Sequence, residues 1–121
     1  MEKERILICD DAEGLRESLR LILEDEYELF FACDGYEAIE LVKNEPIDLV
    51  LLDIKMPRLN GIETLKAIQG IKQEIKVLFV TGYQYTEIAK DAIQLGAQDY
   101  IIKPFSTQEI KTAVKKILKK Q

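Results

Sequence analysis

Short apolar runs alternate with helical patterns along the chain, and this alternation limits the fold more than any other feature of the sequence. Five runs are strand-like, at residues 5–9, 27–33, 48–53, 75–81 and 99–103. After each run, apolar residues recur with the spacing of one helical face, which predicts helices over 14–25, 35–44, 62–68, 86–96 and from Ser106 onward. Strands that alternate with helices indicate an α/β fold, in which helices cover both faces of a parallel sheet.

The polarity of the strands predicts their order in the sheet. The runs at 5–9, 48–53 and 75–81 are apolar on both faces, as central parallel strands must be. The run at 27–33 begins with a charge and the run at 99–103 is short, so both suit the edges. Right-handed crossovers then favour the order 2-1-3-4-5, which is the order known for flavodoxin-like sheets. With short connections and no linker, we expect one domain over residues 1–121.

Particular residues mark the helix ends. Gly70 and Gly96 are expected to stop the third and fourth helices. Ser106 and Glu109 have the spacing of a capping box, which predicts the start of the last helix.

Composition excludes several classes of function. The chain has no histidine, which excludes His-based triads and His-ligated zinc. The net charge of -5 argues against nucleic acid as a direct partner. One basic cluster near the C-terminus is expected to lie on the solvated face of the last helix: Lys111, Lys115, Lys116, Lys119 and Lys120.

The cysteines and the apolar runs predict the compartment. Cys9 and Cys33 both lie in apolar runs without metal-site spacing, so we expect two buried thiols and no disulfide. No apolar run approaches the roughly 20 residues that span a bilayer, and the N-terminus lacks the pattern of a signal peptide. A cytoplasmic protein that does not contact membranes is therefore expected.

Polar residues follow or end four of the five predicted strands. Asp10 and Asp11 follow the first strand, and Asp53 ends the third. Thr81 and Lys103 end the fourth and fifth. Because the carboxyl ends of parallel strands share one rim, and strands 1 and 3 flank the switch point, these five side chains should converge on one crevice.

Three carboxylates in one crevice require compensation. Two unit charges about 4 Å apart repel by roughly 4 kcal/mol at an effective dielectric constant of 20. Lys103 offsets one of the three negative charges. A raised pKa of a carboxyl group or a bound cation must relieve the remaining repulsion. A donor set of oxygens alone favours Mg²⁺ over Ca²⁺ or Zn²⁺. A carboxylate beside Mg²⁺ and a lysine can attack phosphorus and form an aspartyl phosphate.

A structural explanation competes for one of these acids. Asp11 could instead cap the helix that follows it. Asp53 cannot act as a cap, because the next helix is expected to begin only around Ile62.

Four fragments carry a family resemblance: "CDD", "LLDIKMPRLNG", "VTG" and "DYIIKPF". In this order and spacing, the sequence resembles the receiver domain of bacterial two-component response regulators over essentially the whole chain. The resemblance implies that Asp53 is the phosphoacceptor. It also implies that Asp10 and Asp11 bind Mg²⁺ together with Asp53 and the backbone carbonyl of Lys55.

The resemblance assigns roles to further residues. Thr81 would be the switch hydroxyl, Tyr100 the switch aromatic residue, and Lys103 the group that holds the phosphoryl oxygens. The peptide bond between Lys103 and Pro104 would be cis. Lys55 and Tyr83, which stand two positions after Asp53 and Thr81, would tune the lifetime of the phosphate. The loop after Asp53 would be shaped by Met56, Pro57 and Gly61.

The resemblance also implies partners. The phosphodonor would be a sensor histidine kinase or a histidine phosphotransfer protein. Output would pass to an effector protein or domain through the face made by the fourth helix, fifth strand and fifth helix, from Tyr85 to Lys120, and this face could support a homodimer. The donor would dock on a surface around Ala12, Gly14, Leu15, Pro104 and Phe105.

Four alternatives stay open. The chain could be the N-terminal receiver of a DNA-binding transcriptional regulator rather than a stand-alone protein. A phosphatase of the haloacid-dehalogenase type is less favoured. Those enzymes have a D-x-D pattern at the nucleophile, and this chain has Lys55 where the second aspartate of that pattern would stand. A flavin-binding module would need a loop rich in Ser, Thr or Gly where this chain has "DDAEG". A scaffold that is never phosphorylated is disfavoured by the presence of Asp53.

Overall fold

A helix follows every strand in the computed structural model, which describes residues 2–119. All strand pairs are parallel, and the order is β2-β1-β3-β4-β5, as predicted. The strands are β1 (Arg5–Cys9), β2 (Glu28–Ala32), β3 (Leu49–Leu52), β4 (Lys76–Gly82) and β5 (Asp99–Lys103). The α-helices are α1 (Glu13–Leu23), α2 (Gly35–Asn44), α3 (Gly61–Ile71), α4 (Thr86–Gln94) and α5 (Thr107–Leu118), with a 3-10 turn, η1 (Tyr83–Tyr85), before α4.

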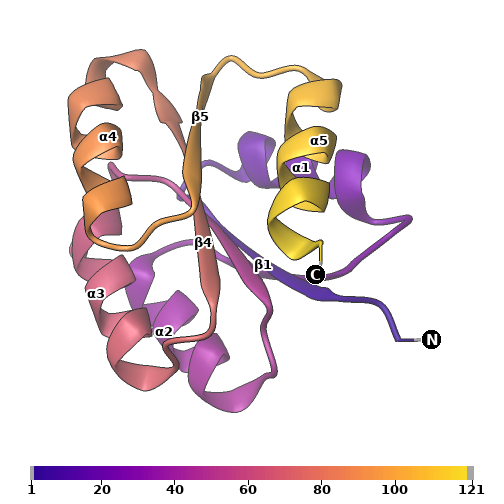
Figure 1. Cartoon of the computed structure of the whole chain (residues 1–121), viewed down its shortest axis with the longest axis horizontal. Helices are drawn as coiled ribbons and strands as arrows, with labels where there is room; N and C mark the ends of the chain where they lie inside the picture. The colour runs from indigo at the N-terminus through magenta and orange to yellow at the C-terminus, as the bar shows by residue number, and fades with distance from the viewer. Residues whose placement is uncertain (1, 120–121) are drawn as a thin grey trace.

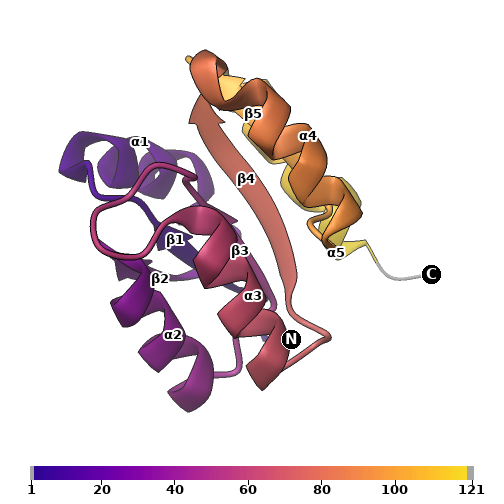
Figure 2. The ribbon, with the colours of Figure 1, turned by 90° about the vertical axis from the view of Figure 1, so that its left-hand side faces the viewer.

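Alternate residues of the central strands feed two apolar cores on opposite faces of the sheet. In β1, Leu7 joins the core under α2, α3 and α4, whereas Ile6 and Ile8 join the core under α1 and α5. Figure 1 shows these two helical layers with the sheet between them, and Figure 2 views the molecule from the side of α2, α3 and α4. Because both faces are covered, the central strands are apolar on both faces between their ends, which is the pattern that predicted their places.

Most helix ends lie within two residues of their predicted positions, and the end of α3 needs a correction. Ser106 and Glu109 form the expected capping box of α5. At the end of α4, Gly96 has a φ of 113°, and the amides of Gly96 and Ala97 donate to the carbonyls of Ile93 and Ala92, a Schellman motif. The prediction that Gly70 stops α3 is wrong, because the helix continues to Ile71.

The second correction concerns the cysteines. Both are free, as expected, and Cys9 is buried, but Cys33 is exposed. Cys33 follows the last residue of β2, an edge strand whose outward positions meet solvent. Among the described residues, no helix has the length and apolar character needed to cross a membrane.

Candidate functional site

The three aspartates predicted from the sequence meet at the carboxyl rim of the sheet. Asp10 and Asp11 follow β1, and Asp53 follows β3, which is the neighbour of β1. Each offers a carboxylate oxygen, and these oxygens all lie within 4.8 Å of one another. Asp10 and Asp53 are buried, whereas Asp11 is exposed. Adjacent strands therefore produce the carboxylate cluster that the spacing predicted.

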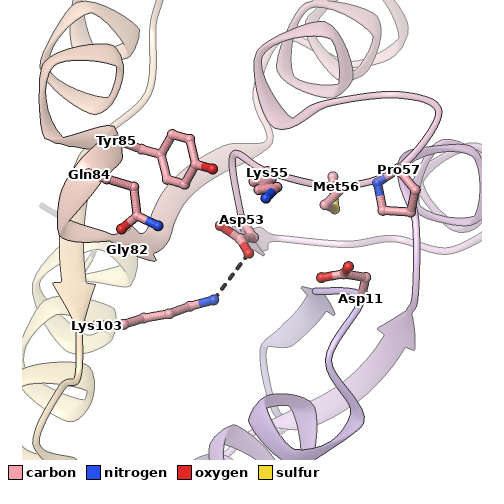
Figure 3. Close-up of a pocket in the computed structure, with 9 residues that line it drawn as sticks. All are labelled: Asp11, Asp53, Lys55, Met56, Pro57, Gly82, Gln84, Tyr85 and Lys103. Carbon is pink, nitrogen blue, oxygen red and sulfur yellow. Dashed lines mark hydrogen bonds and ion pairs between the residues drawn. The ribbon is translucent and has the colours of Figure 1, made fainter.

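Lys103 and Thr81 complete this cluster from β5 and β4. The Lys103 Nζ donates to Asp10 Oδ2 at 2.9 Å and to Asp53 Oδ2 at 3.1 Å (Figure 3 shows the second bond). The Thr81 hydroxyl donates to Asp53 Oδ1 at 2.7 Å. Both oxygens of Asp53 thus already contact groups that stabilise negative charge, and such groups can equally bind phosphoryl oxygens.

Burial and the neighbouring charges shift the pKa values of Asp10 and Lys103. Burial raises the pKa of Asp10, and this effect outweighs the opposing hydrogen bonds from the Ala12 amide and Lys103. For Lys103, burial favours the neutral amine, but its hydrogen bond to Asp10 and the charge of Asp53 outweigh this and raise its pKa. The lysine is therefore held as a cation between two carboxylates, and the excess negative charge favours a further cation.

The start of α1 shows that Asp11 does not cap the helix. The N-cap residue is Ala12, and no side chain caps the first turn. Asp10 instead accepts a hydrogen bond from the Ala12 amide at 2.9 Å. Arg16, which the sequence did not single out, donates to the backbone carbonyl of Asp10 at 2.7 Å. The capping alternative is wrong, and Asp11 remains available to bind a cation.

A cavity of about 520 Å³ opens above Asp53 (Figure 3). Two of its lining residues, Gln84 and Tyr85, were not predicted, because their positions depend on the η1 turn. Tyr83, which was predicted to affect phosphate lifetime, is 77% exposed and lines a neighbouring groove instead. The cavity is lined by Asp11, Asp53, Lys55, Met56, Pro57, Gly82, Gln84, Tyr85 and Lys103.

The chemistry of this donor set fits Mg²⁺. Three carboxylates share the site, and Lys55, whose carbonyl was the fourth predicted ligand, lines the same cavity. Hard oxygen ligands suit Mg²⁺, which is commonly bound by one or two carboxylates and keeps positions for water or phosphate.

The loop between β3 and α3 is fixed at both ends. Met56 is buried, and Arg58, with a φ of 68°, forms an ion pair with Asp34 and lies 5.2 Å from the centre of the Tyr36 ring. At the far end, the Gly61 amide donates to the Ile54 carbonyl at 2.8 Å. The loop that follows Asp53 is thus attached to the start of α2 and to the end of β3.

Gly61→Ala is expected to destabilise the protein and distort this loop. A Cβ at position 61 would lie 2.3 Å from the backbone oxygen of Asp53 and 2.8 Å from the Ile54 Cα, and backbone atoms cannot move aside cheaply. We expect the free energy of unfolding, measured in urea, to fall by about 1–3 kcal/mol, as for other overpacked sites. Gly70→Ala is the matched control, because a Cβ there meets nothing within 4 Å. Equal loss of stability in both variants would contradict the prediction.

The remaining predicted residues lie near the same rim. The peptide bond between Lys103 and Pro104 is cis. Tyr100 is half-buried and packs against the core under α4. Leu15, Pro104 and Phe105, three of the predicted docking residues, line a groove of about 540 Å³ beside the site.

The predicted output face exposes apolar side chains of α4 and its C-terminal end. Ile88, Ile93 and Leu95 are exposed there. Lys120, the predicted limit of this face and the last of the C-terminal lysines, lies outside the described residues.

Comparisons with known proteins agree with this geometry. The family model "Response regulator receiver domain" matches residues 6–115. The chain is 41% identical over 119 residues to sporulation initiation phosphotransferase F of Bacillus subtilis (strain 168), covering 98% of this chain and 96% of that protein. It is 34% identical over 117 residues to response regulator MprA of Mycobacterium sp. (strain KMS), covering 96% of this chain but 51% of MprA.

A solved structure gives the same result for the fold. The receiver domain of NtrX from Brucella abortus matches with a TM-score of 0.91 and 32% identity, covering 96% of this chain and 99% of that domain. The solved structure thus agrees with the flavodoxin-like fold of this chain, whose sheet has the order β2-β1-β3-β4-β5. The chain belongs to the response regulator receiver domain family.

Proposed function

We propose that this chain accepts a phosphoryl group on Asp53 from a phosphohistidine of a sensor kinase or phosphotransfer protein, in a reaction that requires Mg²⁺. The observation that carries the proposal is the arrangement around Asp53. Its two oxygens contact the Lys103 ammonium and the Thr81 hydroxyl, and two further carboxylates lie within 4.8 Å. This set combines a nucleophile with groups that stabilise the charge on phosphoryl oxygens.

The transfer makes use of the contacts that Asp53 already has. One Asp53 oxygen bonds to phosphorus while the bond to the donor histidine nitrogen breaks, and the electron pair stays with that nitrogen. The Thr81 hydroxyl and the Lys103 ammonium can turn from the carboxylate to the phosphoryl oxygens, since both are donors. Asp10, Asp11, Asp53 and the Lys55 carbonyl would hold the Mg²⁺, which supplies positive charge for the phosphoryl oxygens.

We propose that Asp53 is the acceptor rather than its acidic neighbours. Asp10 is buried, with one oxygen bound to the Ala12 amide and the other to Lys103. Asp11 lines the cavity, but the hydroxyl and ammonium donors of the described site contact Asp53. Asp53 alone combines a place on the cavity wall with two charge-stabilising donors.

Output would follow through α4, β5 and α5. Thr81, in β4, contacts the acceptor directly, and Tyr100 lies in β5, the strand paired with β4. Movement of Thr81 toward the phosphoryl group would allow Tyr100 to turn inward and change the face around Ile88 and Leu95. That face would then bind an effector protein, an effector domain or a second copy of the chain.

The proposal is tested by phosphoryl uptake and metal binding together. With acetyl phosphate and Mg²⁺, intact mass spectrometry is expected to show addition of one phosphoryl group, and none in the presence of EDTA. Independently of this reaction, isothermal titration calorimetry should detect Mg²⁺ binding that Asp11→Asn weakens by about tenfold or more, since a ligand is lost. Asp25→Asn, at an exposed acid outside the site, is the control. Uptake that is unaffected by EDTA would contradict the proposed role of the metal.

A further inference from the structure

The 3-10 turn after β4 places an amide group at the phosphoryl site. Gln84, in η1, lines the cavity that holds Asp53 and Lys103. Figure 3 shows the amide end of Gln84 between the ribbon at Gly82 and the carboxylate of Asp53. None of the hydrogen bonds within residues 2–119 involves the side-chain amide of Gln84. Its N–H donors and its oxygen acceptor are therefore free.

The absence of a side chain at position 82 makes room for this amide. A Cβ at Gly82 would lie 2.5 Å from the Gln84 Oε1 and 3.1 Å from its Cδ. The neighbouring residue Tyr85 is half-buried and packs against the core, which fixes the end of the turn. Gln84 thus lines both this cavity and the neighbouring groove, whereas Tyr83 lines the groove and not the cavity.

We propose that the Gln84 amide positions the water that hydrolyses the aspartyl phosphate, and thereby sets the lifetime of the phosphorylated state. This inference rests on the proposed function, since it needs a phosphoryl group on Asp53. An amide can accept a hydrogen bond from water and donate one to a phosphoryl oxygen at the same time. In GTPases a glutamine orients the attacking water in this manner.

The hydrolysis balances without a general base. The water oxygen bonds to phosphorus, and the bond between phosphorus and the Asp53 oxygen breaks. The electron pair returns to Asp53 as a carboxylate, and the released dihydrogen phosphate carries both hydrogen atoms of the water. Gln84 changes neither its charge nor its covalent bonds in this step, and it acts only through hydrogen bonds.

The test compares the half-lives of phosphorylated variants. Wild type, Gln84→Ala and Gln84→Met are phosphorylated with acetyl phosphate and Mg²⁺, the donor is removed by desalting, and intact mass is followed over time. We expect both substitutions to lengthen the half-life by about two- to tenfold, the range for one hydrogen bond. Gln98→Ala, at an exposed glutamine before β5, is the control and should decay like wild type.

A second variant tests the position of the amide rather than its presence. Gly82→Ala should displace the flexible end of Gln84 and lengthen the half-life, but add little in the Gln84→Ala background, as expected for coupled sites.

Equal half-lives in wild type and both Gln84 variants would overturn this inference alone. A shorter half-life in Gln84→Ala with an unchanged one in Gln84→Met would also overturn it, because Gln84 would then only shield the phosphate. No phosphoryl uptake by wild type would overturn the proposed function as well.

Discussion

Asp53→Asn is expected to abolish phosphoryl uptake from acetyl phosphate and Mg²⁺ completely, whereas the wild-type chain gains one group. Asparagine has nearly the size of aspartate, and its amide oxygen can still accept the 2.7 Å hydrogen bond from Thr81. It lacks the negative charge that makes the carboxylate a nucleophile. The loss is therefore chemical and not structural, and circular dichroism and urea unfolding should show a folded protein.

Two further substitutions separate the acceptor from its surroundings. Asp11→Asn keeps the Asp53 nucleophile but removes a predicted metal ligand, so uptake should slow and recover at higher Mg²⁺ concentration. Asp99→Asn, at an exposed acid that begins β5, should behave like wild type. If Asp53→Asn still gains a phosphoryl group, peptide mapping should be applied to Asp10 and Asp11, and the assignment of Asp53 as acceptor would be wrong.

The parallel sheet and the acidic cluster could be predicted from the alternation of strands and helices, whereas the strand order also needed the polarity of the strands and the order known for flavodoxin-like sheets. Once strands alternate with helices, all carboxyl ends lie on one rim, and Asp10, Asp53 and Thr81 need only occupy those ends to meet. No knowledge of a loop conformation is needed for this step. The same reasoning places Lys103, whose long side chain reaches both buried acids from the edge strand β5.

The parts that the sequence did not predict depend on loops and on strand edges. Gln84 lines the cavity above Asp53 and the neighbouring groove, whereas Tyr83 lines the groove alone, and the 3-10 turn that holds both residues gave no signal in the sequence. Arg58 pairs with Asp34 and has a left-handed backbone, and no local pattern in the sequence indicates either feature. Cys33 was expected to be buried from its apolar neighbours, but the edge strand ends just before it and leaves it exposed.

Lys103→Met should destabilise the metal-free protein more than Gly61→Ala does. The Lys103 ammonium lies between Asp10 and Asp53, whose side chains are only 4% and 8% exposed. Its removal leaves two buried carboxylates without their counterion, and breaking such a pair typically costs several kcal/mol. Since the Lys103 side chain keeps 26% exposure, we expect a loss of about 2–4 kcal/mol at about pH 7.5 in urea unfolding with EDTA. Lys66→Met, at an exposed position of α3, is the control.

The size of this loss should depend on pH and on Mg²⁺. Burial raises the pKa of Asp10 in the folded protein above its unfolded value, so the folded state binds more protons between these two pKa values. Stability from this group therefore increases as the pH falls, and the effect is larger in Lys103→Met, where the opposing ammonium is absent. The difference between variant and wild type should narrow at about pH 5 and also on addition of Mg²⁺, which replaces the missing positive charge. A difference that is the same at both pH values and with or without Mg²⁺ would mean that Lys103 contributes by packing alone, and not by neutralising the carboxylates.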